Sequence, residues 1–208
     1  MSVKNNINDI HISKTLSWLL RHGAVKESLP INPDGFINVQ TILQHRSLRG
    51  KCSVEDIKRI VVNNDKQRFA LRSSDNVLEI RANQGHSVKE INAVDLKPIY
   101  NASELNSIIH GTFYTFWNSI KTNGLSRMNR NHIHFASGLP SDSQVISGMR
   151  KSCELYIYIN VASVLSAGIS IFRSANGVIL SSGNEKGVIE TKHFLKVIDA
   201  ASGNILTY

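Results

Sequence analysis

The sequence predicts an α+β protein of two lobes, in which a helical first half ends in a β-hairpin and the second half consists mainly of strands. Apolar residues recur at helical spacing in several segments before residue 65, whereas short apolar runs at strand spacing follow residue 95. The composition changes near Val94 to Pro98. We therefore expect one lobe at residues 1–95 and another at residues 96–208.

The first half opens with a polar segment, residues 1–10, that we expect to be loose. Ser13 is suited to cap a helix whose apolar positions follow the helical period, and Gly23 is suited to end it. Arg21 and His22 then fall in the last turn, where the helix dipole favours cations.

The rest of the first half combines short helices with a hairpin. Pro33-Asp34-Gly35 predicts a turn, and Ser53 predicts the N-cap of a further helix. Phe69–Arg72 and Val77–Ala82 predict the two strands of the hairpin. This order is that of a winged-helix module, which often binds nucleic acid, although a fold alone does not establish function.

The second half contains one clear helix and several strands. Tyr114 to Thr122 predicts the helix, which Asn123-Gly124 closes. The strongest strand signal is Leu155-Tyr156-Ile157-Tyr158-Ile159. Further strand candidates are Ile169–Phe172, Gly177–Leu180 and Phe194–Ile198.

Length, net charge and cysteine content indicate which partners and which cellular compartment the protein is suited to. The chain has 208 residues and a net charge of +8. Residues 1–95 hold 14 basic and 10 acidic side chains and residues 96–208 hold 10 and 6, so each half carries +4 and a polyanionic partner is mildly favoured. No apolar run approaches membrane-spanning length, so we expect no membrane partner. Cys52 and Cys153 lack metal-type spacing and suit a reducing compartment, the cytosol or the nucleus.

Three segments place an arginine where an ordered element is expected to end. The central one runs from Ile80 to Ser87, where a strand delivers Arg81 and then breaks into amide, glycine, His86 and Ser87. The other two are Leu20-Arg21-His22-Gly23 and Ile146-Ser147-Gly148-Met149-Arg150. We expect the three arginines to meet around one phosphate, although Arg21 and His22 could also be only a favourable helix C-terminus.

Histidines of the second half provide a different kind of candidate site. In His110-Gly111-Thr112, an imidazole and a hydroxyl can bond ribose hydroxyls while the glycine permits close approach of the backbone. His132 and His134 share one face of a strand and could bind substrate, hold a metal or be structural. No third metal ligand of suitable spacing follows, so we expect no metal. The sequence also lacks the P-loop, GxGxxG, GxSxG and HExxH patterns.

Eight motifs in order resemble those of a known family. They are Leu19-Leu20-Arg21-His22-Gly23, Asp34-Gly35-Phe36, Ile80 to Ser87, His110-Gly111-Thr112, Gly124-Leu125, His132-Ile133-His134, Val145 to Arg150 and Ser174-Ala175-Asn176-Gly177-Val178. Together, from Ser13 to Ile198, they resemble the NAD-dependent RNA (tRNA) 2′-phosphotransferase family, and most closely its animal branch. Each motif alone is weak, but eight in the same order are specific.

The resemblance implies a fold, an activity and a set of catalytic residues. The first lobe would be a winged helix that handles RNA, and the second an ADP-ribosyltransferase-like lobe that binds NAD. The 2′-phosphate of RNA, such as spliced tRNA, would attack C1 of the nicotinamide ribose and release nicotinamide. The neighbouring ribose hydroxyl would then attack the phosphorus, giving 2′-OH RNA and ADP-ribose 1″,2″-cyclic phosphate. The family's catalytic tetrad falls on Arg21, His22, Arg81 and Arg150.

The resemblance also implies binding residues in each lobe. NAD, a consumed co-substrate, would contact His110, Gly111, Thr112, Gly124, Leu125, His132, His134 and Phe172. RNA or phosphate would contact His86, Ser87 and Lys151. The related protein-modifying ADP-ribosyltransferases have a glutamate where this chain has Val178, which makes attack by protein side chains less favoured.

Two other functions fit the same residues. One is ADP-ribosylation of terminal phosphates on nucleic acid, which would leave a stable ADP-ribosylated product. The other is a non-catalytic winged-helix RNA-binding protein, which would bind RNA in a salt-sensitive manner and would not bind NAD.

Overall fold

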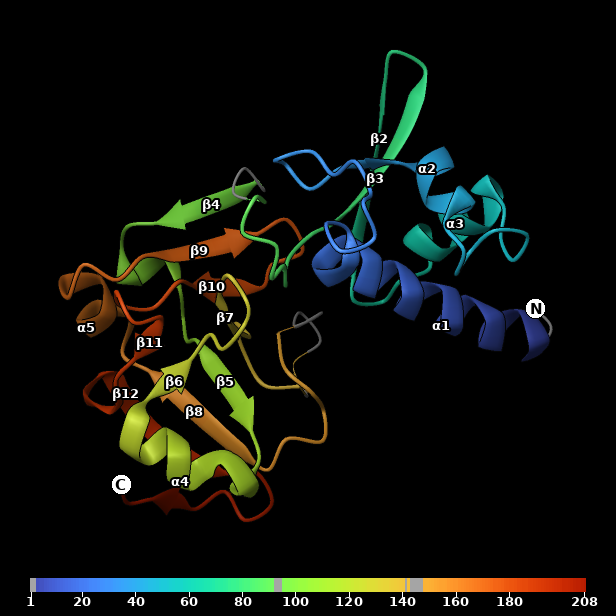
Figure 1. Ribbon diagram of the computed structural model, residues 1–208. Helices are drawn as coiled ribbons and strands as arrows, with labels where there is room; N and C mark the ends of the chain where they lie inside the picture. Colours follow the sequence, from blue (N-terminus) through green and yellow to red (C-terminus); the bar gives the residue numbers. More distant parts are fainter. Residues whose placement is uncertain (1–2, 92–94, 141, 143–147) are drawn as a thin grey trace. The chain divides into compact units, whose positions relative to one another are not determined.

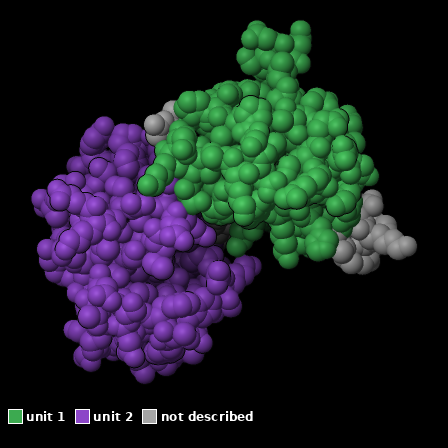
Figure 2. All heavy atoms as spheres, in the orientation of Figure 1, with its two compact units in different colours: residues 1–95 green, residues 96–208 purple. Residues whose placement is uncertain are grey.

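A computed structural model of the protein describes residues 3–91, 95–140, 142 and 148–208 and contains both helices and sheets (Figure 1). The predicted α+β class is thus confirmed. The chain divides into two compact units, Met1–Asp95 and Leu96–Tyr208 (Figure 2). Each unit has its own hydrophobic core. None of the described helices is long and apolar enough to cross a membrane.

The first unit consists of helices and one small antiparallel sheet. Its elements are α1 (Val3–Trp18), a π-helical turn (Leu19–Gly23), β1 (Ile37–Asn38), α2 (Val39–Gln44), α3 (Val54–Val62), β2 (Phe69–Ser74) and β3 (Val77–Ala82). The strand order is β1-β3-β2, so β3 is central. The tip of the β2–β3 hairpin extends away from α2 and α3 (Figure 1).

Several local predictions for this unit are confirmed. The hairpin pairs Phe69 with Ala82 through Ser74 with Val77. Ser53 caps α3, where its Oγ accepts a hydrogen bond from the Asp56 backbone while the Asp56 carboxylate accepts one from the Ser53 backbone. Ile57 and Ile60 of α3 are buried in the core and Val61 packs against it, at the helical spacing that brings apolar side chains to one side.

The expected start of the first helix was wrong. Helix α1 begins at Val3, so Ser13 lies inside it and does not cap it, and residues 3–10 are helical rather than loose. Ser13 fits the interior because Ile12 and Leu16 are buried and continue the apolar face of the helix. A serine in the sequence indicates where a helix could start but not whether the preceding residues also find a surface to pack against.

The second unit is built from antiparallel sheets around a single core. Its strands are β4 (Leu96–Ile99), β5 (Ile109–Thr112), β6 (Leu125–Ser126), β7 (Ile133–Phe135), β8 (Leu155–Ile159), β9 (Ile171–Ser174), β10 (Ile179–Ser181), β11 (Val188–Ile189), β12 (Phe194–Asp199) and β13 (Ile205–Leu206). Its helices are α4 (Tyr114–Asn123) and α5 (Val161–Ser166), with 3-10 turns at Ala102–Glu104 and Thr191–His193. The strand orders are β4-β9-β10-β7, β13-β12-β8-β5 and β11-β6.

The predicted elements of this unit are present, with shifts at their ends. Helix α4 ends at Asn123 before Gly124, as expected, and β8 spans the predicted residues with an alternating burial pattern. The strand predicted at 169–172 is β9, displaced by two residues, and the one predicted at 177–180 is β10, which begins at Ile179. These shifts arise because Asn176-Gly177 forms the turn itself rather than the start of the next strand.

Replacing Ser53 with Ala should destabilise the first unit by about 1 kcal/mol, because the first turn of α3 loses its side-chain acceptor. Ser53→Thr retains a hydroxyl and is the matched control, which should stay near wild type. Urea unfolding followed by circular dichroism measures both. Equal stability of the alanine and threonine variants would contradict the assigned role of the cap.

Candidate anion and nucleotide sites

In the first unit, the π-helical turn and the loop after β3 bring several predicted residues together. The Ser87 backbone N–H donates to the Arg21 carbonyl at 2.9 Å, and a hydrogen bond of 2.9 Å joins His22 Nδ1 to Ser87 Oγ. Gly85 has φ +89°, and a Cβ built there would lie 3.5 Å from Arg21 Nε. Glycine is therefore suited to this position by its backbone conformation, while a Cβ would make only an ordinary contact with the arginine.

The π-helical turn itself depends on Gly23. A Cβ at this residue would lie 2.6 Å from the Trp18 ring, so only glycine leaves room for the indole. Gly23 does not have a positive φ. The helical segment ends at Gly23, as predicted, but glycine is required there by packing against Trp18 and not by its backbone conformation. The widened turn sets the direction of Arg21 and His22, and such turns frequently occur at functional sites.

Arg81 lies beside an aromatic ring and close to His86. Its Cζ is 4.8 Å from the centroid of Phe36, and the side chain is 8% exposed. A Cβ built on Gly35 would lie 3.9 Å from Arg81 Cβ and 3.5 Å from His86 Nε2, so the Asp34–Phe36 turn packs against both residues. Stacking of a guanidinium on a ring restrains its plane while leaving its N–H edge for an acceptor.

The same ring also contacts a second arginine, whose charge is neutralised. Arg72 Cζ lies 3.8 Å from the Phe36 centroid, and its guanidinium pairs with Asp34 at 2.5 Å and with Glu79 at 2.6 Å. The described residues include no carboxylate paired with Arg81, and Arg81 Nε has no hydrogen-bond partner among them. Of the two stacked arginines, Arg81 is therefore the one suited to bind an anion.

Arg150 and Lys151 belong to the second unit. Arg150 is exposed, with its Cζ 5.8 Å from the centroid of Phe113. A Cβ on Gly148 would lie 2.7 Å from the Phe135 carbonyl oxygen, so this glycine lets the Arg150 segment pack tightly on the end of β7. Residues 145–147 of the predicted motif lie outside the described residues.

The predicted nucleotide residues fall into two groups. His132, His134 and Phe172 gather at one sheet, because Phe172 pairs with Leu180 and Leu180 with His134 across β9, β10 and β7. The rings of His132 and Phe172 meet edge to face at 5.9 Å. His110 joins this group through a 2.9 Å hydrogen bond between its Nδ1 and the His134 carbonyl. Two imidazoles near a phenyl ring can bond phosphate or hydroxyl groups and stack with a base.

The electrostatics of this histidine group suit neutral imidazoles beside cations. Burial lowers the pKa of His132, and the nearby Arg127 lowers it further. Burial likewise lowers the pKa of His110, with a smaller contribution from Arg130. Both rings are thus kept neutral near physiological pH, and the charge of the two arginines is of the sign that a pyrophosphate requires. The residues present therefore fit a dinucleotide.

Four other predicted residues have contacts that explain them structurally. A Cβ at Gly111 would lie 2.7 Å from Cys153 Sγ, so protein rather than ligand fills that space. The Thr112 side chain is buried. A Cβ at Gly124 would lie 2.5 Å from the Ile189 carbonyl oxygen, and Leu125 belongs to the hydrophobic core. Contacts of these four with a nucleotide stay predictions.

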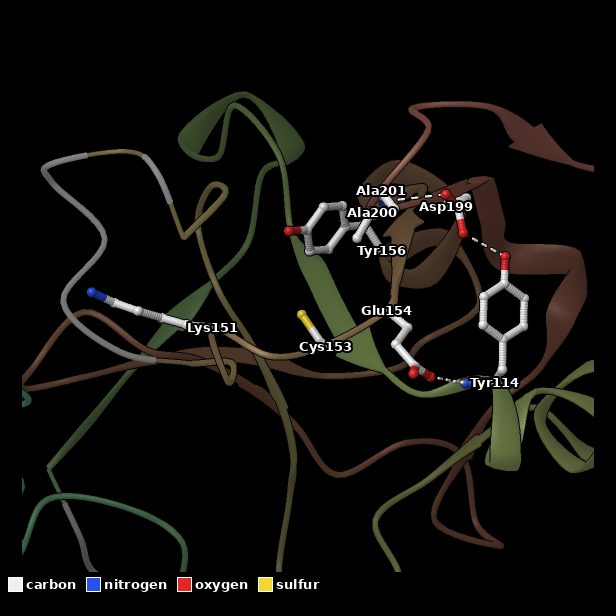
Figure 3. A pocket seen from close by; sticks show the side chains of 8 residues that line it. All are labelled: Tyr114, Lys151, Cys153, Glu154, Tyr156, Asp199, Ala200 and Ala201. Carbon is white, nitrogen blue, oxygen red and sulfur yellow. Dashed lines mark hydrogen bonds between the residues drawn. The ribbon is translucent and has the colours of Figure 1, made fainter.

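A shallow pocket of about 450 Å³ lies beside Lys151 (Figure 3). Its other lining residues are Tyr114, Cys153, Glu154, Tyr156, Asp199, Ala200 and Ala201. The Tyr114 hydroxyl donates to Asp199 at 2.5 Å, and this bond, with bonds from Ser202, lowers the pKa of Asp199 to about 2. Glu154 accepts a hydrogen bond from the Tyr114 backbone, so both acidic side chains of the pocket are already bonded within the protein. Among the described residues, no group of three or more His, Cys, Asp or Glu side chains is arranged to hold a metal.

The structural partners of the site are not evident from the sequence. Phe36 belongs to the Asp34-Gly35-Phe36 motif, but the motif alone does not indicate that the ring contacts two arginines. Arg127 and Arg130 were not singled out, although the arginines in 127–130 precede the histidine motif directly. Their position in the sequence was the one available signal.

A family model and individual relatives all indicate similarity to RNA 2'-phosphotransferases. The model of the family described as "RNA 2'-phosphotransferase, Tpt1 / KptA family" matches residues 7–183. The chain is 46% identical over 190 residues to tRNA 2'-phosphotransferase 1 of Danio rerio, covering 89% of this chain and 84% of the relative. It is 47% identical over 193 residues to tRNA 2'-phosphotransferase 1 of Homo sapiens, covering 91% and 76%. A probable RNA 2'-phosphotransferase of Rhizobium johnstonii is 32% identical, covering 83% and 89%. The two animal proteins are thus more similar than the bacterial one.

The stability of the second unit should fall as the pH drops below about 6.5, the ordinary pKa of histidine. Because burial lowers the pKa of folded His132, the unfolded chain binds more protons between the two pKa values. The contribution of His132 to stability is complete above its pKa in the unfolded chain. It is lost as the pH falls toward its lower pKa in the folded protein. His132→Gln should therefore lose less stability between pH 7.5 and 5.5, by at most about 1.4 kcal/mol per pH unit.

Urea unfolding at the two pH values measures this difference. His11→Gln, which replaces an exposed histidine of the first unit, is the control and should follow wild type. A His132→Gln variant with the pH dependence of wild type would show that His132 does not titrate as described.

Proposed function

We propose, from the premise that this chain belongs to the RNA 2'-phosphotransferase, Tpt1/KptA family, that it is an NAD-dependent tRNA 2′-phosphotransferase. It transfers the 2′-phosphate of RNA, such as spliced tRNA, to NAD. The products are RNA with a 2′-OH, nicotinamide and ADP-ribose 1″,2″-cyclic phosphate. The single observation that carries this assignment beyond the family is the buried Arg81, stacked on Phe36 and paired with no carboxylate in the described part of the chain.

Each unit has a proposed fold and role. The order helix, short strand, two helices and hairpin in the first unit supports a winged helix that handles RNA. The antiparallel sheets of the second unit, with the neutral histidines beside Phe172, support an ADP-ribosyltransferase-like lobe that binds NAD. Two free cysteines, Cys52 and Cys153, agree with a cytosolic or nuclear location.

In the first step, the RNA 2′-phosphate forms a bond to C1 of the nicotinamide ribose as the bond to nicotinamide breaks. The phosphate is already an anion, so this step needs orientation rather than a strong base. Arg21 and Arg81 are proposed to orient it with bidentate hydrogen bonds, together with Arg150. The product of this step is RNA that carries ADP-ribose on its 2′-phosphate.

In the second step, the adjacent ribose hydroxyl attacks the phosphorus, and the bond from phosphorus to the RNA 2′ oxygen breaks. One proton leaves the attacking hydroxyl and one arrives at the RNA oxygen, so no net charge is lost. His22 is proposed to move this proton, since imidazole has a suitable pKa, and its bond to Ser87 fixes the orientation of the ring. The arginines stabilise the charge that builds on the phosphoryl group.

Purified protein tests the assignment directly. With NAD and an oligoribonucleotide that carries an internal 2′-phosphate, it should release nicotinamide and leave a 2′-OH. A stable ADP-ribosylated product without loss of phosphate would indicate an ADP-ribosyltransferase acting on phosphates instead. RNA binding without nicotinamide release at any NAD concentration would indicate a non-catalytic RNA-binding protein.

Replacing Arg81 or His22 with Ala should slow the second step at least as much as the first, so that RNA with ADP-ribose on its 2′-phosphate accumulates. Mass spectrometry of the RNA during a single turnover detects this species. Arg49→Ala, which removes an exposed arginine of the same unit, should behave as wild type. Normal turnover of the Arg81 and His22 variants would remove these residues from the mechanism.

Replacing Phe36 with Leu should lower kcat by roughly tenfold, because a guanidinium stacked on an aromatic ring is stabilised by about 1 kcal/mol or more when partly buried. Phe36→Tyr retains the ring and is the matched control. Steady-state kinetics with thermal unfolding of each variant separates turnover from stability. The positioning role of the ring is excluded if leucine and tyrosine support the same kcat.

A further inference from the structure

One more residue pair follows the end of the β2–β3 hairpin, beyond Arg81. Phe69 pairs with Ala82, and the Asn83 backbone N–H then donates to the Arg68 carbonyl at 2.9 Å. Arg68 and Asn83 are thus opposite each other. Arg68 and Asn83 lie one residue beyond the ends of β2 and β3. Extending the alternation of side chains by this one step assigns the pair to the face of Arg81 rather than to the core face of Ala82.

Arg68 is a half-buried cation with few partners of its own. Its Nη1 donates to the Asn64 side-chain oxygen at 3.3 Å, which is a neutral acceptor. Burial lowers the pKa of its guanidinium, and the charge of the nearby Asp65 carboxylate offsets this only in part. No salt bridge joins Arg68 to Asp65 or to another carboxylate among the described residues. An arginine has five N–H donors, and a cation removed from water is ordinarily paired with an anion. Arg68 therefore has the capacity to bind a further anion.

Asn83 presents an acceptor beside this cation. The residue is 5% exposed, and its Nδ2 donates to the Gln67 carbonyl at 2.6 Å, which fixes the orientation of the amide. Its Oδ1 is buried and receives no hydrogen bond from the residues that the structure describes. A buried acceptor without a donor costs free energy unless a ligand or water supplies one.

An internal 2′-phosphate always has a second phosphate beside it. The 2′ oxygen and the 3′ oxygen are attached to adjacent ribose carbons, and in an internal nucleotide the 3′ oxygen belongs to the phosphodiester that continues the strand. A site for such RNA must therefore accommodate two anions close together. Arg81 is opposite Ala70, so Arg68 is its diagonal neighbour, at about 7–8 Å and within reach of two arginine side chains.

We propose that Arg68 binds the phosphodiester on the 3′ side of the 2′-phosphorylated nucleotide, and that Asn83 Oδ1 accepts a hydrogen bond from the 2′-hydroxyl of the next ribose. This inference rests on the proposed function, in which Arg81 binds the 2′-phosphate itself. It assigns to the hairpin face the selection of internal over terminal 2′-phosphates. The next 2′-hydroxyl also distinguishes RNA from DNA at that position.

Two substrates test the role of Arg68. One oligoribonucleotide has an internal 2′-phosphate followed by a phosphodiester, and the other has its 2′-phosphate on the last nucleotide with a free 3′-OH. Arg68→Gln should raise KM for the internal substrate by roughly tenfold to a hundredfold, the value of a charge-assisted hydrogen bond, and leave KM for the terminal substrate within about twofold. Arg68→Lys retains the charge and should fall between Arg68→Gln and wild type.

Arg49→Gln removes the same charge from an exposed position of the unit and should leave the preference of wild type unchanged. The KM for NAD should stay within about twofold of wild type in each variant, which shows that the second unit is intact. An equal effect of Arg68→Gln on both substrates, or no effect on either, overturns the proposal. Failure of wild type to transfer phosphate from either substrate would instead refute the proposed function.

A deoxy substitution tests Asn83. Replacing the next 2′-hydroxyl with hydrogen should raise the KM of wild type severalfold, whereas in Asn83→Ala the same substitution should have no further effect. If the two changes are additive, Asn83 does not contact that hydroxyl. If Asn83→Ala unfolds, the wild-type protein still tests the contact with the deoxy and ribo substrates. Equal KM values for these two substrates would exclude a contact with the 2′-hydroxyl.

Discussion

The candidate phosphate site depends on the different pairing of two arginines that share one aromatic ring. Phe36 contacts both Arg72 and Arg81, but Asp34 and Glu79 neutralise Arg72 alone. The ion pairs hold the turn, the ring and the hairpin together, which keeps the ring in place beside Arg81. One arginine thus stabilises the scaffold, while the other has no carboxylate partner among the described residues and is the one proposed to bind a substrate anion.

A second constraint orients the N-terminal part of the site. The backbone hydrogen bond from Ser87 to the Arg21 carbonyl and the side-chain bond between Ser87 and His22 tie the π-helical turn to the loop after β3. Gly85 permits this arrangement by adopting a positive φ, and Gly23 permits it by leaving space for the Trp18 ring. A cation, Arg21, and the proposed proton carrier, His22, are consequently held by the same short loop.

The second unit contributes chemistry of a different kind. Burial lowers the pKa of His110 and of His132, which keeps both rings neutral, and Phe172 lies edge-on to His132, so this surface offers hydrogen bonds and an aromatic wall. A neutral surface flanked by arginines suits a dinucleotide, whose negative charge is confined to its pyrophosphate. In the proposed reaction, proton transfer relies on the first unit and NAD binding on the second, while the arginines proposed to bind the phosphate come from both.

The sequence by itself determined the family, the α+β class, the β2–β3 hairpin, helix α4 and the identity of the candidate residues, because motif order and local periodicity depend on neighbours a few residues apart. It did not determine which arginine is neutralised, since Asp34 is 38 residues from Arg72 along the chain. Nor did it reveal that α1 starts at Val3, or that Cys153 fills the space beside Gly111. Only tertiary structure decides these features, because pairing, desolvation and close packing depend on side chains that meet through folding.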